Sequence, residues 1–248
     1  MLKKIKNILR EQDFSPGILG VVINPFYLAR KALSVNIKKL SPEITGRVLD
    51  IGCGTKPYQK MFQCTEYIGV EIDSAENRDK QIADFFYDGK RLPFKDSEFD
   101  SIIINQVLEH VFNPDEFLQE VRRVLKPVGK LLITVPFVWD EHEQPNDYAR
   151  YSSYGLKFIL ENHGFTVLKQ IKSLNSLKLI FQLLIAWFFK KINLKNKYLN
   201  FLIISAFSTV FNISGIIISA LFPVNNDLYL DNIILAEKDT RELDNESN

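Results

Sequence analysis

The sequence predicts an α/β protein with a parallel sheet that binds a nucleotide-type ligand at its carboxyl edge. Residues 46–54 read Gly-Arg-Val-Leu-Asp-Ile-Gly-Cys-Gly, a short apolar strand that ends near an acidic residue and opens into a glycine turn. About twenty residues later, residues 67–73 form a second apolar strand that ends in carboxylates, the spacing of a ribose-binding acid. Further apolar strands alternate with helical patterns, which favours parallel strand pairing.

The glycine turn carries the first functional signal. Gly52 and Gly54 remove Cβ atoms where the backbone must turn sharply and where a ligand could approach closely. Asp50 is an anion among apolar residues and needs a hydrogen-bond donor, which a bound ligand could supply. Lys56 stands near the place of the third glycine of a dinucleotide fingerprint, so this turn alone also fits a purely structural strand ending.

Two further strands and a helix follow. Residues 99–105 and 130–136 are apolar runs typical of buried strands. Between them, Asn113 is expected to cap a helix that has a proline at its first position, and Glu116 to close a capping box. Residues 126–129, Lys-Pro-Val-Gly, are expected to end that helix.

The order of these motifs resembles the class I S-adenosylmethionine-dependent methyltransferases, in particular the type 11-like subgroup. The matching pattern is Leu-Pro-Phe at 92–94, Phe-Asp at 99–100, Leu-Glu-His-Val at 108–111 and Arg-Val-Leu-Lys-Pro-Val-Gly at 123–129. The resemblance covers roughly residues 46–168. It implies a doubly wound, mostly parallel seven-stranded sheet, with S-adenosyl-L-methionine at the carboxyl ends of strands 1 to 4.

The resemblance also implies which residues contact the cofactor. They are Asp50, Gly52, Cys53 and Gly54 in the turn at the methionine part, Glu71 at the ribose hydroxyls, Asp88 at the adenine amino group, and Asn105 or Gln106 near the sulfonium. Asp73 and Asp84 remain alternatives for the ribose and adenine contacts, and each of these carboxylates could instead be a solvated strand-end charge. Residues 105–108, Asn-Gln-Val-Leu, differ from the Asn-Pro-Pro-Tyr signature for planar amino groups, which argues against a nucleobase or amide nitrogen as acceptor.

Residues 137–151 are expected to form the acceptor pocket. They follow the fourth strand and are dense in aromatic and ionisable side chains, whereas a merely structural loop favours glycine and small polar residues. In proteins that resemble this one, the corresponding loop faces the cofactor. The substrate-contact candidates here are Trp139, Asp147, Arg150 and Tyr151.

The catalytic candidates are two histidines. Methyl transfer is an in-line displacement that depends mainly on positioning, and an alcohol acceptor also needs a base. His142 and His110 both map to the cofactor face and suit a base or an acceptor-orienting role. A competing interpretation is that both only orient loops. His163 precedes a glycine and is expected to be a helix-end residue.

An apolar insert separates the sixth strand, which starts at residue 165, from the seventh, at residues 230–236. Residues 174–189 and 199–222 are strongly apolar, and the second segment is long enough to cross a bilayer. A single crossing would place the seventh strand on the opposite side of the membrane from the others. We therefore expect a helical pair that covers the acceptor site and touches the membrane interface. The expected organisation is an N-terminal helical region at 1–45, a methyltransferase core at 46–173, the insert at 174–224, and the last strand with an acidic tail at 225–248.

The near-zero net charge hides a strong asymmetry. Residues 1–40 carry eight basic and two acidic side chains, residues 169–197 carry seven basic and none acidic, and residues 227–248 carry seven acidic and two basic. Residues 2–10 fit an amphipathic helix on a membrane surface or, equally, a solvated helix capping the domain. No signal peptide is expected, because residues 17–23 are too short and too displaced for its apolar region.

These observations favour an S-adenosylmethionine-dependent methyltransferase of a small-molecule, glycan or lipid-linked acceptor, acting on oxygen at the cytoplasmic membrane face. A catalytically idle, cofactor-binding scaffold of a membrane complex is the alternative. Two lone cysteines, Cys53 and Cys64, indicate a reducing compartment and offer no metal-site spacing, so no metal is expected. The missing Gly-x-Gly-x-x-Gly argues against a nicotinamide dehydrogenase, and basic residues interleaved with apolar segments argue against a nucleic-acid partner.

Overall fold

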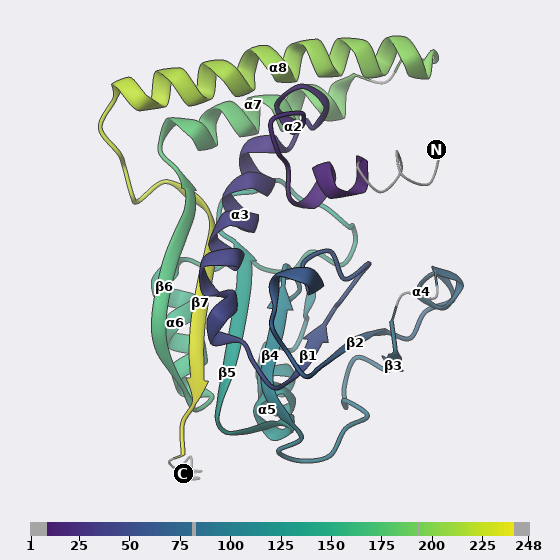
Figure 1. Cartoon of the computed structure of the whole chain (residues 1–248), viewed down its shortest axis with the longest axis vertical. Coiled ribbons are helices and arrows are strands. Elements are labelled where there is room, and N and C mark those ends of the chain that lie inside the picture. The colour runs from purple at the N-terminus through teal and green to yellow at the C-terminus, as the bar shows by residue number, and fades with distance from the viewer. Residues whose placement is uncertain (1–8, 81–82, 193, 241–248) are drawn as a thin grey trace. The chain divides into compact units, whose positions relative to one another are not determined.

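The computed structural model describes residues 9–80, 83–192 and 194–240 (Figure 1). The chain divides into two compact units: the first contains residues 1–36 and 172–231, and the second contains residues 37–171 and 232–248. The amphipathic helix expected over residues 2–10 lies almost wholly outside the described residues, as does the end of the acidic tail from residue 241.

The described strands of the chain form one seven-stranded sheet in the order β3-β2-β1-β4-β5-β7-β6. The strands are β1 Arg47–Ile51, β2 Glu66–Ile72, β3 Phe85–Tyr87, β4 Phe99–Asn105, β5 Leu125–Pro136, β6 Phe165–Asn175 and β7 Tyr229–Lys238. The pairs β1–β2, β1–β4, β2–β3 and β4–β5 are parallel, whereas β7 runs in the opposite direction (Figure 1). This is the mostly parallel α/β sheet that the resemblance implies.

The central strands are buried because their residues are almost continuously apolar. In the register of β1, Leu49 lies between Ile68 of β2 and Ile102 of β4. Asp50 is aligned with Gly69, so the acidic residue of β1 reaches the carboxyl edge beside a residue that has no side chain. The parallel pairing brings the carboxyl ends of β1, β2, β4 and β5 to the same edge of the sheet.

The helices of the second unit follow the expected positions with two corrections. They are α4 Ala75–Lys80, α5 Pro114–Val124 and α6 Ser153–Asn162, with short 3-10 turns η1 Ser41–Glu43, η2 Gln59–Met61 and η3 Leu108–His110. Asn113 holds the N-cap position of α5, but in the described structure its side chain makes no capping hydrogen bond, so the expected capping box is wrong. Residues 126–129 belong to β5, because Leu125 is already buried and paired with Phe99. Ser152 caps α6 as expected, accepting a hydrogen bond of 3.1 Å from the backbone N–H of Gly155.

The first unit is helical, apart from the ends of β6 and β7. It contains α2 Gly20–Ile23, the start of α3 Tyr27–Leu40, α7 Leu177–Lys191 and α8 Lys197–Leu221. The two long helices of the insert lie side by side (Figure 1), and the rings of Phe188 and Phe207 stack at 3.6 Å. The buried amide of Gln182 ties α7 to the α2–α3 connection, since it accepts from the N–H of Ala29 and donates to the carbonyl of Pro25, both at 3.0 Å.

The polarity of α8 is reversed relative to a helix on the surface of a water-soluble domain. Its buried side chains are mainly small or polar, namely Ile204, Ser205, Ser208, Asn212 and Gly215. Its exposed side chains are large and apolar, among them Leu199, Phe201, Leu202, Val210, Ile213 and Ile217. Within the described ranges, α8 is the one helix long and apolar enough to cross a membrane by length and composition.

Candidate cofactor and acceptor site

The carboxyl end of β1 holds a buried carboxyl group. Asp50 is 5% exposed, and the hydroxyl of Tyr67 donates a hydrogen bond of 2.7 Å to its Oδ2 atom. Burial raises the pKa of Asp50 to about 7, and the nearby charge of Glu71 acts in the same direction. The hydrogen-bond donor that Asp50 was expected to need is thus supplied by Tyr67 of β2.

The two glycines of the turn differ in what surrounds them. Both have positive φ angles, +67° at Gly52 and +48° at Gly54, which favour glycine. A Cβ atom added to Gly52 would lie 2.4 Å from Cγ2 of Val107, whereas one added to Gly54 would have no heavy atom of the described residues within 4 Å. Gly52 thus leaves room for Val107 of the segment after β4, whereas Gly54 borders open space. Cys53 between them is buried, which raises the pKa of its thiol to about 12.

The end of β2 is joined to this turn. The backbone N–H of Gly54 donates a hydrogen bond of 2.6 Å to Oε1 of Glu71, so this carboxylate sits beside the glycine turn, as a ribose contact requires. Its rivals have other partners. Asp73 pairs with Arg78, and Asp84 accepts from the N–H of Gly69 at 2.7 Å.

Lys56 explains the missing third glycine. Its φ angle of +51° lies in the left-handed region that a glycine would otherwise occupy. Its ammonium group forms an ion pair with Asp84. The turn thus keeps the glycine-like backbone conformation while gaining a charged contact with the segment before β3.

Asp88 lies in the loop after β3 and is exposed. Its Oδ1 atom accepts hydrogen bonds from the N–H groups of Lys90 at 2.9 Å and Arg91 at 3.0 Å, and these bonds lower its pKa. The side chain therefore fixes the conformation of its own loop. A contact between Asp88 and adenine stays a prediction.

Asn105 and Gln106 are connected through a residue of β5. The hydroxyl of Thr134 donates to Oδ1 of Asn105 at 2.8 Å and accepts from Nε2 of Gln106 at 3.1 Å. Gln106 has a φ angle of +56°, a strained conformation that clusters at functional sites. The sequence analysis did not single out Thr134, although a hydroxyl inside a buried apolar strand was a signal for it.

The acceptor loop is held by a buried ion pair. Arg150 binds Asp147 through two hydrogen bonds of 2.5 and 2.6 Å, and the side chain of Asp147 is 3% exposed. These bonds hold the pKa of Asp147 well below its usual range. Arg150 also donates to the carbonyls of Asp140 at 3.1 Å and Ala149 at 2.7 Å. The pair therefore shapes the loop from inside.

The other two substrate candidates contribute backbone atoms to the same scaffold. The carbonyl of Trp139 accepts from Nε of Arg150 at 3.4 Å, and the carbonyl of Tyr151 accepts from Nδ2 of Asn232 on β7 at 2.7 Å. Burial raises the pKa of the Tyr151 hydroxyl. Direct contacts of these side chains with an acceptor stay predictions.

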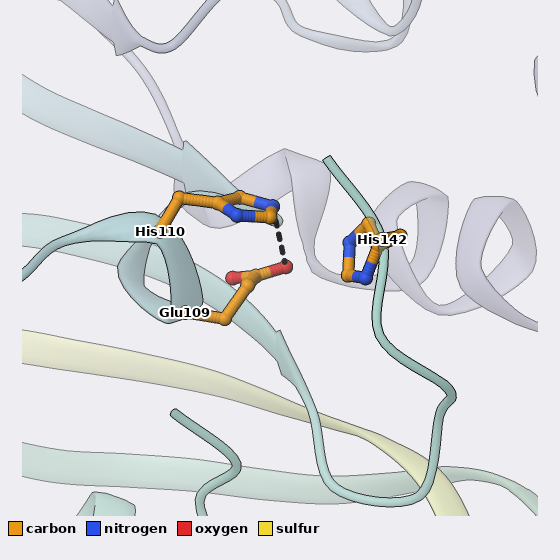
Figure 2. A group of neighbouring side chains, drawn as sticks. All are labelled: Glu109, His110 and His142. Carbon is orange, nitrogen blue, oxygen red and sulfur yellow. Dashed lines mark ion pairs between the residues drawn. The ribbon is translucent and has the colours of Figure 1, made fainter. Parts of the chain in front are cut away.

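Glu109, His110 and His142 form a compact cluster (Figure 2). The two imidazole rings meet edge to face at 4.8 Å between centroids, and Nε2 of His110 lies 3.9 Å from Oε1 of Glu109. One donor atom from each residue lies within 4.8 Å of the other two, so these side chains could hold a metal ion. Both histidines were predicted from the sequence as catalytic candidates, whereas Glu109, which directly precedes His110, was not predicted.

The third histidine, His163, does not belong to this cluster. His163 caps the end of α6, where its Nδ1–H donates to the carbonyl of Ile159 at 2.7 Å, and its Nε2 lies 3.3 Å from Asp115. It is a helix-end residue, as expected. A surface cavity lies at the amino end of β1, beside Arg47 and Phe94, which is the wrong edge of the sheet for the cofactor.

A family profile described as a methyltransferase domain matches residues 49–133, the segment that runs from the glycine turn to β5. Over these residues the chain carries a methyltransferase domain of the class I S-adenosylmethionine-dependent type. S-adenosylmethionine is accordingly the cofactor, and the open space at Gly54, whose N–H donates to Glu71, is where we expect it to bind.

Relatives of the chain match it in part. It is 40% identical to an uncharacterized protein of Methanocaldococcus jannaschii over 91 residues, which are 36% of this chain and 44% of the relative. It is 33% identical to the malonyl-[acyl-carrier protein] O-methyltransferase of Erwinia pyrifoliae over 95 residues, 36% of each chain. The chain thus spans less than half the length of these relatives. The crystal structure of an S-adenosylmethionine-dependent methyltransferase from Archaeoglobus fulgidus shares the fold, with a TM-score of 0.53, 20% identity, and coverage of 83% of this chain and 93% of that one.

Proposed function

We propose that this methyltransferase transfers a methyl group to an oxygen atom of a small-molecule, glycan or lipid-linked acceptor at the cytoplasmic face of a membrane. The observation that carries the acceptor assignment is the cluster of Glu109, His110 and His142 next to the cofactor edge. A partial relative that is named as an O-methyltransferase supports the choice of oxygen.

The cluster is connected to the glycine turn through Val107, which precedes the short helix η3. Gly52 packs directly against Val107, and η3, which carries Glu109 and His110, begins at the next residue. His142 reaches the cluster from the acceptor loop. The loop is fastened there because the N–H groups of Tyr148 and Ala149 donate to the carbonyl of Glu109 at 2.8 and 3.2 Å. Acceptor-handling side chains therefore lie next to the turn that binds the methyl donor.

In the reaction, a lone pair of the acceptor oxygen attacks the methyl carbon of S-adenosylmethionine. The carbon–sulfur bond breaks, its electron pair stays on sulfur, and the sulfonium becomes a neutral thioether. The acceptor hydroxyl must also lose its proton. His110 and His142 are the imidazoles placed to take this proton or to orient the hydroxyl, and Asp50, Glu71 and Gly54 hold the donor in line.

The membrane assignment is supported by the reversed polarity of α8. Its small and polar side chains face protein, while Leu202 and Ile217 are 62% and 57% exposed. A bilayer interface would cover such a face, whereas water would leave a large apolar patch. Trp187 on α7 is 62% exposed and adds an aromatic anchor.

The charge around these helices points to an anionic surface. Lys190, Lys191, Lys195 and Lys197 are exposed between the end of α7 and the start of α8. Each lysine contributes about 1 kcal/mol near anionic lipid. We therefore propose a peripheral position on the cytoplasmic face, with the helical pair in the interface.

The catalytic part is tested by incubating the full chain with tritium-labelled S-adenosylmethionine and a total membrane extract. We expect S-adenosylhomocysteine to form and label to enter an acid-stable ether or base-labile ester fraction. His142→Ala and His110→Ala should lose turnover while still binding the cofactor, and His163→Ala is the matched control. Cofactor binding without turnover on membrane and soluble extracts would contradict the enzymatic proposal and favour the scaffold.

The membrane part is tested by sedimentation with vesicles of neutral or mixed neutral and anionic lipid. Binding should be stronger to anionic vesicles and should fall when Leu202 and Ile217 are both replaced by asparagine. Phe158→Asn, which changes an apolar side chain that is 67% exposed on α6, is the control. Binding to neither vesicle would contradict the proposed location.

A further inference from the structure

We propose that Glu109, His110 and His142 bind one divalent first-row transition-metal ion. The cluster consists of two imidazoles and one carboxylate, with one donor atom from each within 4.8 Å of the others. No metal was expected from the sequence, because the two lone cysteines have no metal-site spacing. His142 lies more than thirty residues after His110, so no short motif joins the two histidines. The structure brings the three together (Figure 2).

The tautomer of His110 leaves its Nε2 atom able to bind a metal ion. Its Nδ1 atom lies 2.6 Å from the backbone carbonyl of Asn146, and a carbonyl only accepts, so Nδ1 carries the proton. Nε2 then holds a lone pair, and it faces the carboxylates of Glu109 and Glu143, each at 3.9 Å. A lone pair directed at two carboxylates is the arrangement that a cation between them stabilises. A backbone carbonyl on the other nitrogen is a common orienting contact of metal-bound histidines.

The tautomer of His142 likewise leaves its Nε2 atom able to bind a metal ion. Its Nδ1 atom lies 3.3 Å from Oδ2 of Asp147 and 3.3 Å from the carbonyl of Asp140, both of which accept. A guanidinium nitrogen of Arg150 is farther away, at 3.5 Å. The proton therefore resides on Nδ1, and Nε2 is left for a ligand. A carboxylate behind a histidine is the arrangement that raises the basicity of an imidazole ligand.

Glu109 places a buried carboxylate beside the two histidines. Its side chain is 0% exposed, which makes the carboxylate a strong local source of negative potential. Metal–ligand bonds of about 2.1 Å require donor atoms less than about 4.2 Å apart, so the three donors need to move together by roughly an ångström. His142 lies on a loop, which allows this closure.

The donor set selects the type of ion. Two imidazoles and a carboxylate suit zinc, iron(II) or manganese(II), and three protein ligands leave a position open for a further oxygen. That the open position receives the acceptor hydroxyl rests on the proposed function. A bound ion would lower the pKa of the acceptor hydroxyl, so that the hydroxyl would release its proton to water. The two histidines would then act as ligands of the ion and orient the acceptor through it.

The binding test uses Zn²⁺ as the probe. Chelator-treated full chain is dialysed against Zn²⁺, and protein-bound metal is measured by mass spectrometry. We expect one equivalent per chain, lost in His142→Ala and in Glu109→Gln. His163→Ala, which removes a histidine that also faces a carboxylate, should keep the ion. S-adenosylmethionine binding shows that each variant is folded, and His142→Ala, on the partly exposed loop, remains informative if Glu109→Gln does not fold. No stoichiometric zinc, or equal loss in His163→Ala, would overturn the proposal.

The role of the ion is tested separately from the methyltransferase activity. If the chain methylates an acceptor, dialysis against chelator should abolish turnover and Zn²⁺ or Mn²⁺ should restore it. Turnover that persists without metal would overturn the acceptor-binding role while leaving the proposed function intact. Stoichiometric zinc in a chain that shows no turnover would support the site and contradict the proposed function.

Discussion

The phenol of Tyr67 donates a hydrogen bond of 2.7 Å to the carboxyl group of Asp50 across the β1–β2 pair. Two opposing effects meet at this bond. Burial and the charge of Glu71 raise the pKa of Asp50, whereas the Tyr67 hydrogen bond favours the anion and lowers it. The result is a carboxyl group with a pKa of about 7 at the edge of the sheet where we expect the cofactor to bind.

Cofactor affinity should therefore depend on pH. We expect Asp50 to lie beside the ammonium group of the methionine part of S-adenosylmethionine, and only the ionised carboxylate attracts a cation. Because its pKa in the free protein is about 7, the ionised fraction rises roughly tenfold from pH 6 to pH 8. We expect the dissociation constant measured by calorimetry to tighten by about the same factor. Asp50→Asn should bind weakly and with no such dependence. A wild-type affinity that is flat over this range would contradict the assignment.

Removing the phenol should move this transition. Tyr67→Phe deletes the donor that favours the anion, so the pKa of Asp50 rises further and affinity at pH 7 falls. Loss of the buried hydrogen bond should also lower the free energy of unfolding by about 1–2 kcal/mol. Calorimetry across pH and urea denaturation measure the two effects. Tyr154→Phe, at a position 84% exposed, is the control and should change neither.

The two glycines of the turn should respond differently to alanine. Gly52→Ala places a methyl group 2.4 Å from Cγ2 of Val107, so its stability should fall by about 2–4 kcal/mol from strain and overlap. Gly54→Ala carries only the conformational cost of about 1–2 kcal/mol, but its methyl group enters the open space beside the turn. Gly54→Ala should thus fold and lose cofactor affinity. Wild-type affinity in this variant would show that the cofactor does not approach Gly54.

The ion pair inside the acceptor loop should be sensitive to a conservative change. Arg150→Lys keeps the charge but loses the two parallel hydrogen bonds to Asp147 and those to the Asp140 and Ala149 carbonyls. We expect faster proteolysis of the loop, a stability loss of about 1–3 kcal/mol and lower turnover, with cofactor affinity unchanged. Arg78→Lys, which alters a pair with Asp73 that is largely exposed, is the matched control.

The helical unit has its own sensitive position. Gln182→Ala would leave the N–H of Ala29 and the carbonyl of Pro25 without this partner in a buried environment. We expect the free energy of unfolding to fall by about 1–3 kcal/mol, measured by urea denaturation in detergent. Gln170→Ala, at an exposed position of β6, should have a smaller effect. Equal losses would contradict the special role of Gln182.

The elements that sequence reasoning located are those encoded by local patterns. Runs of apolar residues define β1, β2 and β4, and the acid at the end of a strand identifies Asp50 and Glu71. Asn113 shows the limit of such patterns. It has the residue type and position of an N-cap, yet its side chain makes no capping hydrogen bond, so residue type and position alone do not determine the cap geometry.

The parts that sequence reasoning missed depend on contacts between distant segments. Tyr67 satisfies Asp50 from the next strand, and Thr134 joins Asn105 to Gln106 across β4 and β5. The proximity of Glu109 to His142 depends on the acceptor loop, which comes back to this place more than thirty residues later in the chain. The composition of α8 likewise marks it as apolar, but only packing shows that its polar side faces inward.

Cys53 lies between the two glycines of the turn where we expect S-adenosylmethionine to bind, and a thiolate near its electrophilic methyl group would be open to alkylation. Burial, with the charges of Asp50 and Glu71, raises the pKa of its thiol to about 12, so the sulfur stays protonated and is a poor nucleophile under cellular conditions. Cys53 is thereby protected from being methylated by the S-adenosylmethionine that we expect the turn to bind.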